Sequence, residues 1–261
     1  MERARHQRDL GGAASLPMQS MMVVAEDARH NHLLGALSES VLQRWLPNLE
    51  WLDLPLGAVL FESGETSRFV YFPATAIVSL LYAMENGESA EIAVVGNEGM
   101  AGISLFMGGG STSSRALVQS AGTVLRMAAD TFKKEFNRST AVLHLLLLYT
   151  QALITQMAQT AVCNRHHSLD QQLCRWLLLS LDRLQGDKLM MTQKLIANML
   201  GVRREGVTEA AQKLQDAGLI NYSRGNITVL NRKELEQRSC ECYAVVRREY
   251  DRLLPSARAS S

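Results

Sequence analysis

The sequence predicts an α+β protein in which a region of short antiparallel strands is followed by one long helix and then by a mainly helical region. Three observations carry this prediction. β-branched and aromatic runs alternate with turn residues between residues 33 and 130, and no charged residue occurs from Ser139 to Asn164. From Ser168 onwards, apolar residues recur with the period of an α-helix.

Composition and charge favour a soluble chain with two domains. The 261 residues are 47% hydrophobic and 20% charged, which suits two ordinary hydrophobic cores. Residues 1–162 carry 11 Lys and Arg against 15 Asp and Glu, a net charge of −4, whereas residues 163–261 carry 16 against 11, a net charge of +5. The positive half favours a polyanionic partner, although a difference of this size also arises by chance.

The four cysteines and the N-terminal segment indicate the cellular compartment in which the protein is expected. The cysteines lie at positions 163, 174, 240 and 242 without a C-x-x-C pair, which suits neither a zinc ribbon nor a secreted disulfide framework. No apolar signal segment follows the basic start, so we expect a cytoplasmic protein. Residues 1–30 lack periodicity and are expected to form a mobile tail; the alternative is a short strap packed on the next domain.

Four apolar runs predict the strands, at residues 51–65, 69–84, 88–96 and 115–127. Asn86-Gly87 separates two of them, and this pair predicts a hairpin with a type I′ turn. Short strands at this spacing indicate an antiparallel sandwich or barrel. A helix over residues 37–46, with Ser38 as its N-cap, is expected to precede them.

The strand region is poor in catalytic and metal-binding side chains. Between Leu33 and Thr140 there is no histidine or cysteine, which argues strongly against a histidine-ligated metal enzyme. Residues 96–120 instead combine glycines with hydroxyl residues and Arg115, groups that can cradle an anion. The alternative is a glycine-rich connection whose Arg115 is solvated or pairs with a carboxylate.

The uncharged stretch from Ser139 to Asn164 is long enough to consider as a membrane span. Thr and Gln recur through its second half, at positions 150, 151, 155, 156, 159 and 160, and such polar groups are costly in hydrocarbon. A long buried helix fits better. Its apolar residues leave little of the circumference suited to water, and one small barrel covers only one side, so we expect a second copy of the chain on the other.

The following residues have the pattern of a helix-turn-helix. One helix is expected over residues 168–184, and a second begins after Thr192, a natural N-cap, and ends at Gly201, which suits a left-handed turn. The third helix is expected to bury one face: Val207, Ala210, Ala211 and Leu214. Its outer face then carries Glu205, Thr208, Glu209 and Gln212, with Arg203 and Arg204 at its start.

This arrangement is suited to reading DNA. In a helix-turn-helix the second helix enters the major groove, where Arg binds guanine and Glu accepts from cytosine. Residues 218–230 predict two short strands around Arg224, a wing whose arginine is placed to touch phosphate. Asn231 to Glu234 is expected to cap one closing helix that contains Ser239 to Tyr243. The alternative for the outer face is a solvated helix surface.

The chain resembles the Crp/Fnr transcription regulators, most specifically in the segment from Gly201 to Val207, where Arg204 and Glu205 fall on the family's base-reading pair. The resemblance covers residues 33–245. It implies an N-terminal antiparallel β-roll (a double-stranded β-helix of the cyclic-nucleotide-binding type), a long dimerisation helix and a C-terminal winged helix-turn-helix. The expected organisation is a tail (1–30), an effector domain (31–137), a dimerisation helix (138–165), a DNA-binding domain (166–250) and a C-terminal tail (251–261).

The resemblance also implies partners and sites. We expect a homodimer that binds double-stranded DNA, contacts RNA polymerase if it activates transcription, and does not bind membranes. Expected DNA contacts are Thr192, Gln193, Arg203, Arg204, Glu205, Thr208, Glu209, Gln212 and Arg224. Expected effector contacts are Gly102, Ile103, Ser104, Ser113, Ser114 and Arg115.

The β-roll departs from the pattern of cyclic-nucleotide binders in the family. Those proteins have Gly-Glu to hold the ribose, whereas here Ile103 follows Gly102, and Arg115 is followed directly by Ala116 without the usual hydroxyl residue. These departures argue against cyclic AMP or cyclic GMP as the effector. The chain also lacks the N-terminal cysteines that would hold an iron-sulfur centre. No cofactor, metal or catalytic residue is identified.

Two other functions compete with that of a DNA-binding regulator. An enzyme working in the β-roll would need metal ligands or a nucleophile with its base, and the region has no histidine or cysteine. An effector-binding protein with weak or lost DNA specificity is opposed by the intact outer face with Arg204 and Glu205.

Overall fold

The computed structural model describes residues 22–184 and 186–254. Short helices lead into the first sheet: α1 (Ala25–Ala28), α2 (His32–Gly35), α3 (Glu39–Trp45) and the 3-10 turn η1 (Leu46–Asn48). Residues 1–21 of the expected tail lie outside the described part. Residues 22–30 differ from a tail, because they form α1 and bury Ala28 in the core, which matches the packed strap.

One capping residue, Asn31, fixes this lead-in. Asn31 caps α2 through its side-chain oxygen, and its amide donates to the carbonyls of Pro73 and Gly99 at 2.9 and 2.8 Å. The lead-in is therefore tied to the first domain by buried hydrogen bonds. Helix α3 begins after Ser38, as predicted, but the Ser38 side chain makes no capping hydrogen bond.

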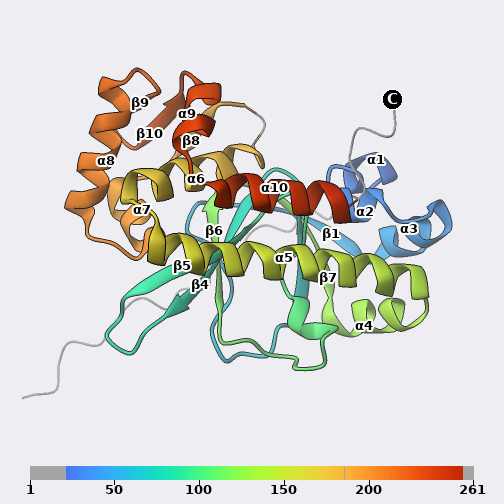
Figure 1. The fold of residues 1–261 in the computed structure, drawn as a ribbon. Coiled ribbons are helices and arrows are strands. Elements are labelled where there is room, and N and C mark those ends of the chain that lie inside the picture. The colour runs from blue at the N-terminus through green and yellow to red at the C-terminus, as the bar shows by residue number, and fades with distance from the viewer. Residues whose placement is uncertain (1–21, 185, 255–261) are drawn as a thin grey trace, which may run out of the picture.

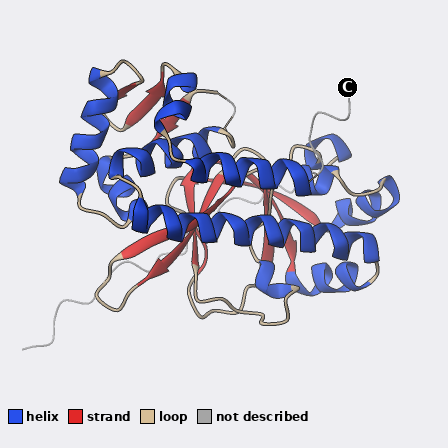
Figure 2. Ribbon diagram, in the orientation of Figure 1, coloured by secondary structure: helices blue, strands red, loops and turns tan. Residues whose placement is uncertain are grey.

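The first domain consists of two antiparallel sheets around one core. Their strands are β1 (Leu49–Leu54), β2 (Val59–Phe61), β3 (Phe69–Pro73), β4 (Ile77–Ala83), β5 (Ser89–Val95), β6 (Arg115–Ser120) and β7 (Gly122–Ala128). The strand orders are β1-β7-β3 and β2-β6-β4-β5, and Figure 2 shows these strands passing behind the long helix. Both sheets contribute to one hydrophobic cluster, with Phe72 and Leu125 from the first and Val78 and Val118 from the second.

Strand β4 is buried on both faces, which explains its continuous apolar run. Val78 and Leu80 point into the core of the first domain, whereas Ile77 and Leu81 join a second core built mainly by the C-terminal helices. The four-stranded sheet thus lies between the two cores.

The turn between β4 and β5 differs from the predicted type I′ turn. The hairpin itself is present, and β4 pairs with β5 up to Ala83 and Ser89. Gly87 has a φ of 86°, but Asn86 does not have the positive φ that a type I′ turn requires at both central residues. Met84 and Glu88 close a three-residue loop instead, through the Met84 N–H and the Glu88 carbonyl at 2.7 Å.

The long helix α5 (Thr140–His166) follows α4 (Ala129–Asn137), and the side chain of Ser139 caps its start. It runs across the width of the molecule beside α10, as Figure 1 shows. Leu146 and Leu153 are buried, whereas four apolar side chains on another face are exposed: Leu143, Leu147, Ile154 and Val162. By length and composition alone α5 could span a membrane, but 44% of its most apolar window is buried within the protein.

The C-terminal part is mainly helical and carries a small sheet of order β8-β10-β9. Its elements are α6 (Leu169–Leu181), β8 (Lys188–Met190), α7 (Gln193–Leu200), α8 (Arg204–Asp216), β9 (Ile220–Ser223), β10 (Asn226–Val229), α9 (Arg232–Arg238) and α10 (Glu241–Leu253). Helix α6 begins at a capping box of Ser168 and Gln171. Together with the antiparallel sheets and the long helix, this part confirms the predicted α+β fold class.

The closing helix predicted after Asn231 is two helices. Asn231 caps α9 as predicted, but α9 ends at Arg238, and Ser239 and Cys240 have extended backbones before α10 begins. The residues 239–243, expected inside one helix, therefore form the break and the first turn of α10.

Candidate DNA-binding surface

Helices α7 and α8 form the predicted helix-turn-helix. The Thr192 hydroxyl accepts a hydrogen bond from the Leu195 N–H at 3.3 Å and caps α7. Gly201 has φ 66° and ψ 36°, a left-handed conformation that ends α7 and that residues with a Cβ adopt only with strain. The Val202 N–H then bonds to the Ala197 carbonyl at 3.0 Å, so the turn into α8 is tightly closed.

Helix α8 buries one face and exposes the other, as its periodicity predicts. The buried residues are Val207, Ala210, Ala211 and Leu214. Gly206 lets α8 approach α6 closely, because a Cβ at this position would lie 2.8 Å from Leu169. The outer face is thereby turned to solvent, and all six of its predicted polar residues are exposed: Arg203, Arg204, Glu205, Thr208, Glu209 and Gln212.

Some of these exposed residues already form hydrogen bonds or ion pairs within the chain. Thr208 bonds to Gln193 at 2.8 Å, which ties α8 to α7. Glu209 pairs with Lys213 at 3.4 Å, and Gln212 donates to a carboxylate one turn later.

The residues at the start of α8 make fewer contacts within the chain than those further along the helix. Within residues 22–184 and 186–254, no ion pair involves Arg203, Arg204 or Glu205. The charged groups that lie nearest the N-terminus of α8 are therefore available to an external partner.

Strands β9 and β10 form the predicted wing. Arg224 and Gly225 have φ values of 49° and 81°, so the two-residue turn has positive φ at both positions, as a type I′ turn requires. The Gly225 carbonyl accepts from the Met191 N–H at 2.7 Å, which places the wing tip beside the start of α7. Arg224 is exposed there, and its neighbour Gly225 lies against Thr192, since a Cβ on Gly225 would be 3.7 Å from the Thr192 side chain.

The residues predicted for effector binding are only partly brought together. Gly102 has a φ of 108° and begins the turn η2 (Ile103–Leu105), and Ile103 packs against the first core. Arg115 pairs with Glu62 at 3.1 Å, the alternative raised for this arginine.

Some hydroxyl residues of this region have hydrogen-bond partners and others have none. Ser113 donates to Tyr82, and Ser114 bonds to Thr112. The hydroxyl of Ser104 is buried and has no hydrogen-bond partner among the described residues, as is also true of Ser67. Gly110 bonds to both residues through its backbone, accepting from the Ser67 N–H at 3.2 Å and donating to the Ser104 carbonyl at 3.1 Å, so the two buried hydroxyls belong to the same part of the β-roll.

Two family models match the chain, one on each side of the long helix. Residues 51–139 match the cyclic nucleotide-binding domain, and residues 171–238 match the Crp-like helix-turn-helix domain. The chain belongs to the Crp/Fnr family of transcriptional regulators. No curated protein sequence is significantly similar to it.

Solved structures of Crp/Fnr proteins have the same fold. A regulator assigned to the Crp/Fnr family from Eubacterium rectale is 19% identical, with a TM-score of 0.63 over 80% of this chain and 98% of that one. A CRP-family regulator from Thermus thermophilus is 16% identical, with a TM-score of 0.61 over 72% and 96%. The c-di-GMP responsive regulator CLP from Xanthomonas campestris is 15% identical, with a TM-score of 0.58 over 74% and 99%. At these sequence identities the similarity shows a shared fold and no more.

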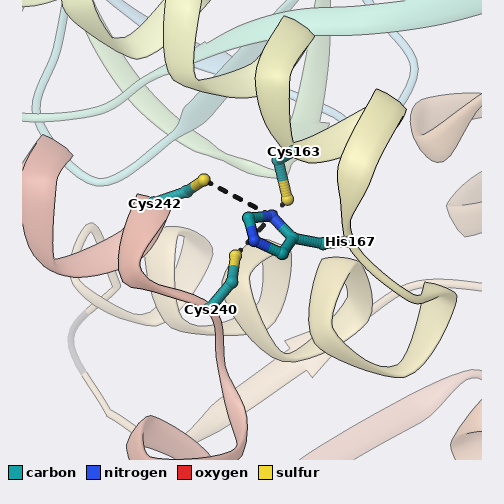
Figure 3. Close-up of side chains that lie close together, drawn as sticks. All are labelled: Cys163, His167, Cys240 and Cys242. Atoms are coloured by element: carbon teal, nitrogen blue, oxygen red, sulfur yellow. Dashed lines mark hydrogen bonds between the residues drawn. The ribbon is translucent and has the colours of Figure 1, made fainter.

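Sequence reasoning missed a cluster of three cysteines and one histidine. Figure 3 shows Cys163 and His167 from the end of α5 facing Cys240 and Cys242 from the start of α10. Their potential metal-binding atoms all lie within 4.8 Å of one another. The only sequence signals are two short spacings, C-x3-H and C-x-C, which lie more than 70 residues apart.

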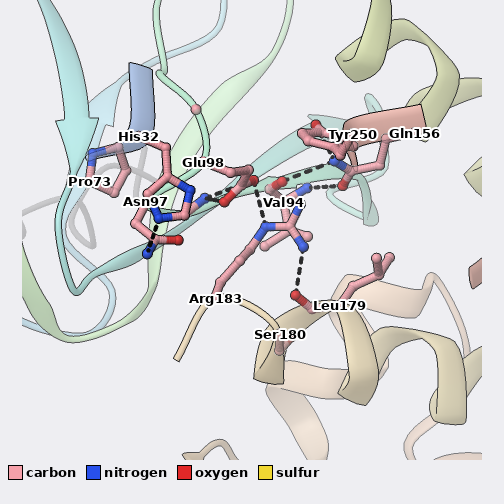
Figure 4. A network of polar contacts seen from close by, with 12 residues as sticks. His32, Pro73, Val94, Asn97, Glu98, Gln156, Leu179, Ser180, Arg183 and Tyr250 are labelled. Carbon is pink, nitrogen blue, oxygen red and sulfur yellow. Dashed lines mark hydrogen bonds and ion pairs between the residues drawn. The ribbon is translucent and has the colours of Figure 1, made fainter. Parts of the chain in front are cut away.

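A second missed feature is a polar network between the domains. Figure 4 shows Arg183, which follows α6, against Glu98 of the β-roll and near Tyr250 of α10. The network borders a cavity of about 690 Å³ that both domains and α10 line.

Proposed function

We propose that this Crp/Fnr protein is a homodimer that binds an inverted repeat in double-stranded DNA through helix α8. The observation that carries the proposal is the exposed start of α8, where Arg203, Arg204 and Glu205 have no ion-pair partner among the described residues. Arginine and glutamate are side chains that read guanine and cytosine in the major groove. The exposed Arg224 in the wing is suited to phosphate.

The exposed stripe of α5 supports the dimer. Leu143, Leu147, Ile154 and Val162 are between 37% and 55% exposed, on a helix that the same chain already covers on its other faces. The α5 helix of a second copy of the chain would pack on this exposed stripe. A second copy is the simplest partner to expect for this surface. Two-fold symmetry would then place the two α8 helices in major grooves about 34 to 36 Å apart.

We further propose that an effector bound in the β-roll near Ser67 and Ser104 is not a cyclic nucleotide. Arg115 is occupied by Glu62, and Ile103 stands where a ribose-binding carboxylate is expected from the resemblance. The unpaired hydroxyls favour a small ligand that offers hydrogen-bond acceptors.

Selection of random double-stranded DNA by the purified full-length protein tests the proposed function. The expected product is an inverted repeat whose half-sites are about one helical turn apart. Mapping of bound sites across the genome of the source cell should return the same motif. Recovery of sequences without a shared motif would contradict sequence-specific binding, and a single half-site without a repeat would contradict the dimer.

A further inference from the structure

Four potential metal ligands meet where the end of α5 faces the start of α10 (Figure 3). Cys163 lies in the last turn of α5 and His167 follows it as the C-cap, whereas Cys240 is the N-cap of α10 and Cys242 lies in its first turn. The Sγ atoms of Cys163 and Cys240 are 3.5 Å apart. Sγ of Cys242 lies 3.6 Å from Nδ1 of His167. All three cysteines are buried.

We propose that Cys163, His167, Cys240 and Cys242 bind one structural zinc ion. Zinc bonds to sulfur at about 2.3 Å and to nitrogen at about 2.0 to 2.1 Å, so tetrahedral geometry places neighbouring ligand atoms about 3.5 to 3.8 Å apart. The separations of 3.5 Å between Cys163 and Cys240 and of 3.6 Å between Cys242 and His167 are close to these lengths, and because all four ligand atoms lie within 4.8 Å of one another, the site needs only small side-chain movements. A multi-iron cluster distributes its cysteines over different irons and needs them further apart.

The histidine is oriented as a zinc ligand. Its Nδ1 faces Cys242, while its Nε2 lies 3.3 Å from a carboxylate oxygen of Glu241. Histidine ligands commonly donate their second ring N–H to a carboxylate, which fixes the tautomer that leaves the other nitrogen free for the metal. Glu241 is therefore a positioning residue for His167.

A buried arginine supplies the charge that such a site needs. Zinc with three thiolates and a neutral histidine carries one net negative charge. Arg175 on α6 is 3% exposed, and its side chain donates to Thr160 at 3.2 Å. Within the described residues no ion pair involves Arg175 and its Nε has no hydrogen-bond partner.

Arg175 reaches α5 beside the cluster. The residue to which it donates, Thr160, lies three residues before Cys163 on the same helix. The charge of the zinc-thiolate group and that of Arg175 would neutralise each other, which makes burial of both more favourable.

Binding involves no change of oxidation state. Zn²⁺ displaces one proton from each of the three thiols, and neutral His167 supplies its nitrogen lone pair. With four protein ligands the site is closed, so its role is structural rather than catalytic. Zinc would join α5 to α10, two helices that pack along each other, at the point where α5 leads into the DNA-binding domain.

The test uses the full chain without a histidine tag. We expect about one zinc per chain by elemental analysis after purification from zinc-supplemented medium. After removal of zinc under reducing conditions, Co²⁺ should give the ligand-field absorption of a tetrahedral site and charge-transfer bands for three thiolates. Cys240→Ser and Cys242→Ser should lose most of the metal, whereas Cys242→His, which replaces one ligand by another, should retain it with a changed cobalt spectrum.

Cys174→Ser is the matched control, because Cys174 is also buried but lies outside the cluster. It should bind zinc like the unmodified protein. Because the serine variants can fail to fold, the cobalt spectrum of the unmodified chain stands as an independent test. Three results would overturn the proposal: a folded, reduced protein that binds neither Zn²⁺ nor Co²⁺, a protein purified with a Cys163–Cys240 disulfide, or iron with inorganic sulfide in place of zinc.

Discussion

Nε of Arg183 lies 2.7 Å from a carboxylate oxygen of Glu98, across the boundary between the β-roll and the DNA-binding domain. The two side chains are only 5% and 16% exposed. Arg183 also donates to the Leu179 carbonyl at 2.6 Å, and a Cβ on Gly96 would collide with it at 2.6 Å. The pair is therefore a buried contact through which the two domains hold each other in one orientation.

Removing one member of this pair should destabilise the protein strongly. Glu98→Gln leaves the Arg183 charge buried without its partner, which typically costs about 3–5 kcal/mol. Arg183→Met together with Glu98→Gln should be less destabilising than the sum of the single changes, since the double variant buries no unpaired charge. Urea unfolding monitored by circular dichroism measures these differences.

The exposed pair of Arg29 and Glu39 provides the control for that comparison. Its side chains are 48% and 60% exposed, so Glu39→Gln should shift the unfolding midpoint little. A Glu98→Gln variant as stable as the Glu39→Gln variant would contradict the structural importance of the interdomain pair.

Glu91 should make stability depend on pH. Burial raises its pKa from 4.5 to about 7, against the opposing effects of Ser79, Arg175 and Arg183. Ser79 has one hydroxyl proton and lies 2.5 Å from Glu91 and 2.7 Å from the Gln119 carbonyl oxygen. A protonated Glu91 allows both contacts, because it donates to Ser79 while Ser79 donates to Gln119.

The sign of the pH effect follows from this raised pKa. Between pH 4.5 and about 7 the folded chain holds a proton at Glu91 that the unfolded chain has lost. The free energy of unfolding should therefore fall as pH rises through this range, by up to about 1.4 kcal/mol per pH unit from this group. Glu91→Gln should remove that component, so it should gain stability relative to the unmodified protein as pH rises. The exposed Glu88 provides the control, and an equal pH dependence in Glu88→Gln and Glu91→Gln would refute the assignment.

The dimer should depend on the exposed stripe of α5. Ile154→Glu places a charge in the middle of the stripe, where burial against a second copy would leave it without a partner. Sedimentation at micromolar concentration should give a dimer for the unmodified protein and a monomer for Ile154→Glu. Leu230→Glu, at a position 60% exposed but far from α5 in sequence, should remain dimeric. A monomeric unmodified protein would disprove the proposed assembly.

Cyclic AMP should bind weakly or not at all. Arg115 is paired with Glu62 and Ile103 provides no acceptor for a ribose hydroxyl. Titration calorimetry should detect no binding of cyclic AMP at micromolar concentration, with a cyclic-AMP-binding protein as the positive control. A micromolar or tighter dissociation constant would contradict this prediction and show that the β-roll recognises nucleotides by other contacts.

Local signals in the sequence were sufficient for the helix-turn-helix. Thr192 and Gly201 mark the ends of α7 by their own backbone preferences, and the spacing from Val207 to Leu214 defines the buried face of α8. The break at Ser239 and Cys240 could not be predicted this way, because neither residue is a helix breaker of the kind that Gly and Pro are.

Local sequence signals could not predict the features that form between distant segments of the chain. The cysteine cluster joins residues from the ends of two helices, and the pair of Arg183 and Glu98 depends on how two domains pack. The Asn86-Gly87 pair does not distinguish a type I′ turn from the three-residue loop that forms, because that loop uses the same Asn-Gly sequence with positive φ at the glycine alone.

Base reading by Arg204 is the central claim, and binding of variants to the selected operator tests it most directly. Arg204→Ala should weaken binding by roughly 1 to 3 kcal/mol per half-site and relax the preference at one base pair, if the arginine binds guanine through two hydrogen bonds. Glu205→Ala should act in the same way at a neighbouring base pair. Arg224→Ala, the matched change in the wing, should weaken all sequences alike and flatten the dependence of affinity on salt.

The decisive measurement is the affinity of each variant for the operator and its single-base-pair variants across a series of salt concentrations. The proposed function predicts that Arg204→Ala loses discrimination at one position of each half-site while Arg224→Ala keeps discrimination at every position. Uniform weakening by Arg204→Ala without relaxation at any position, or no effect, would contradict base reading and leave the exposed face of α8 as a solvated surface.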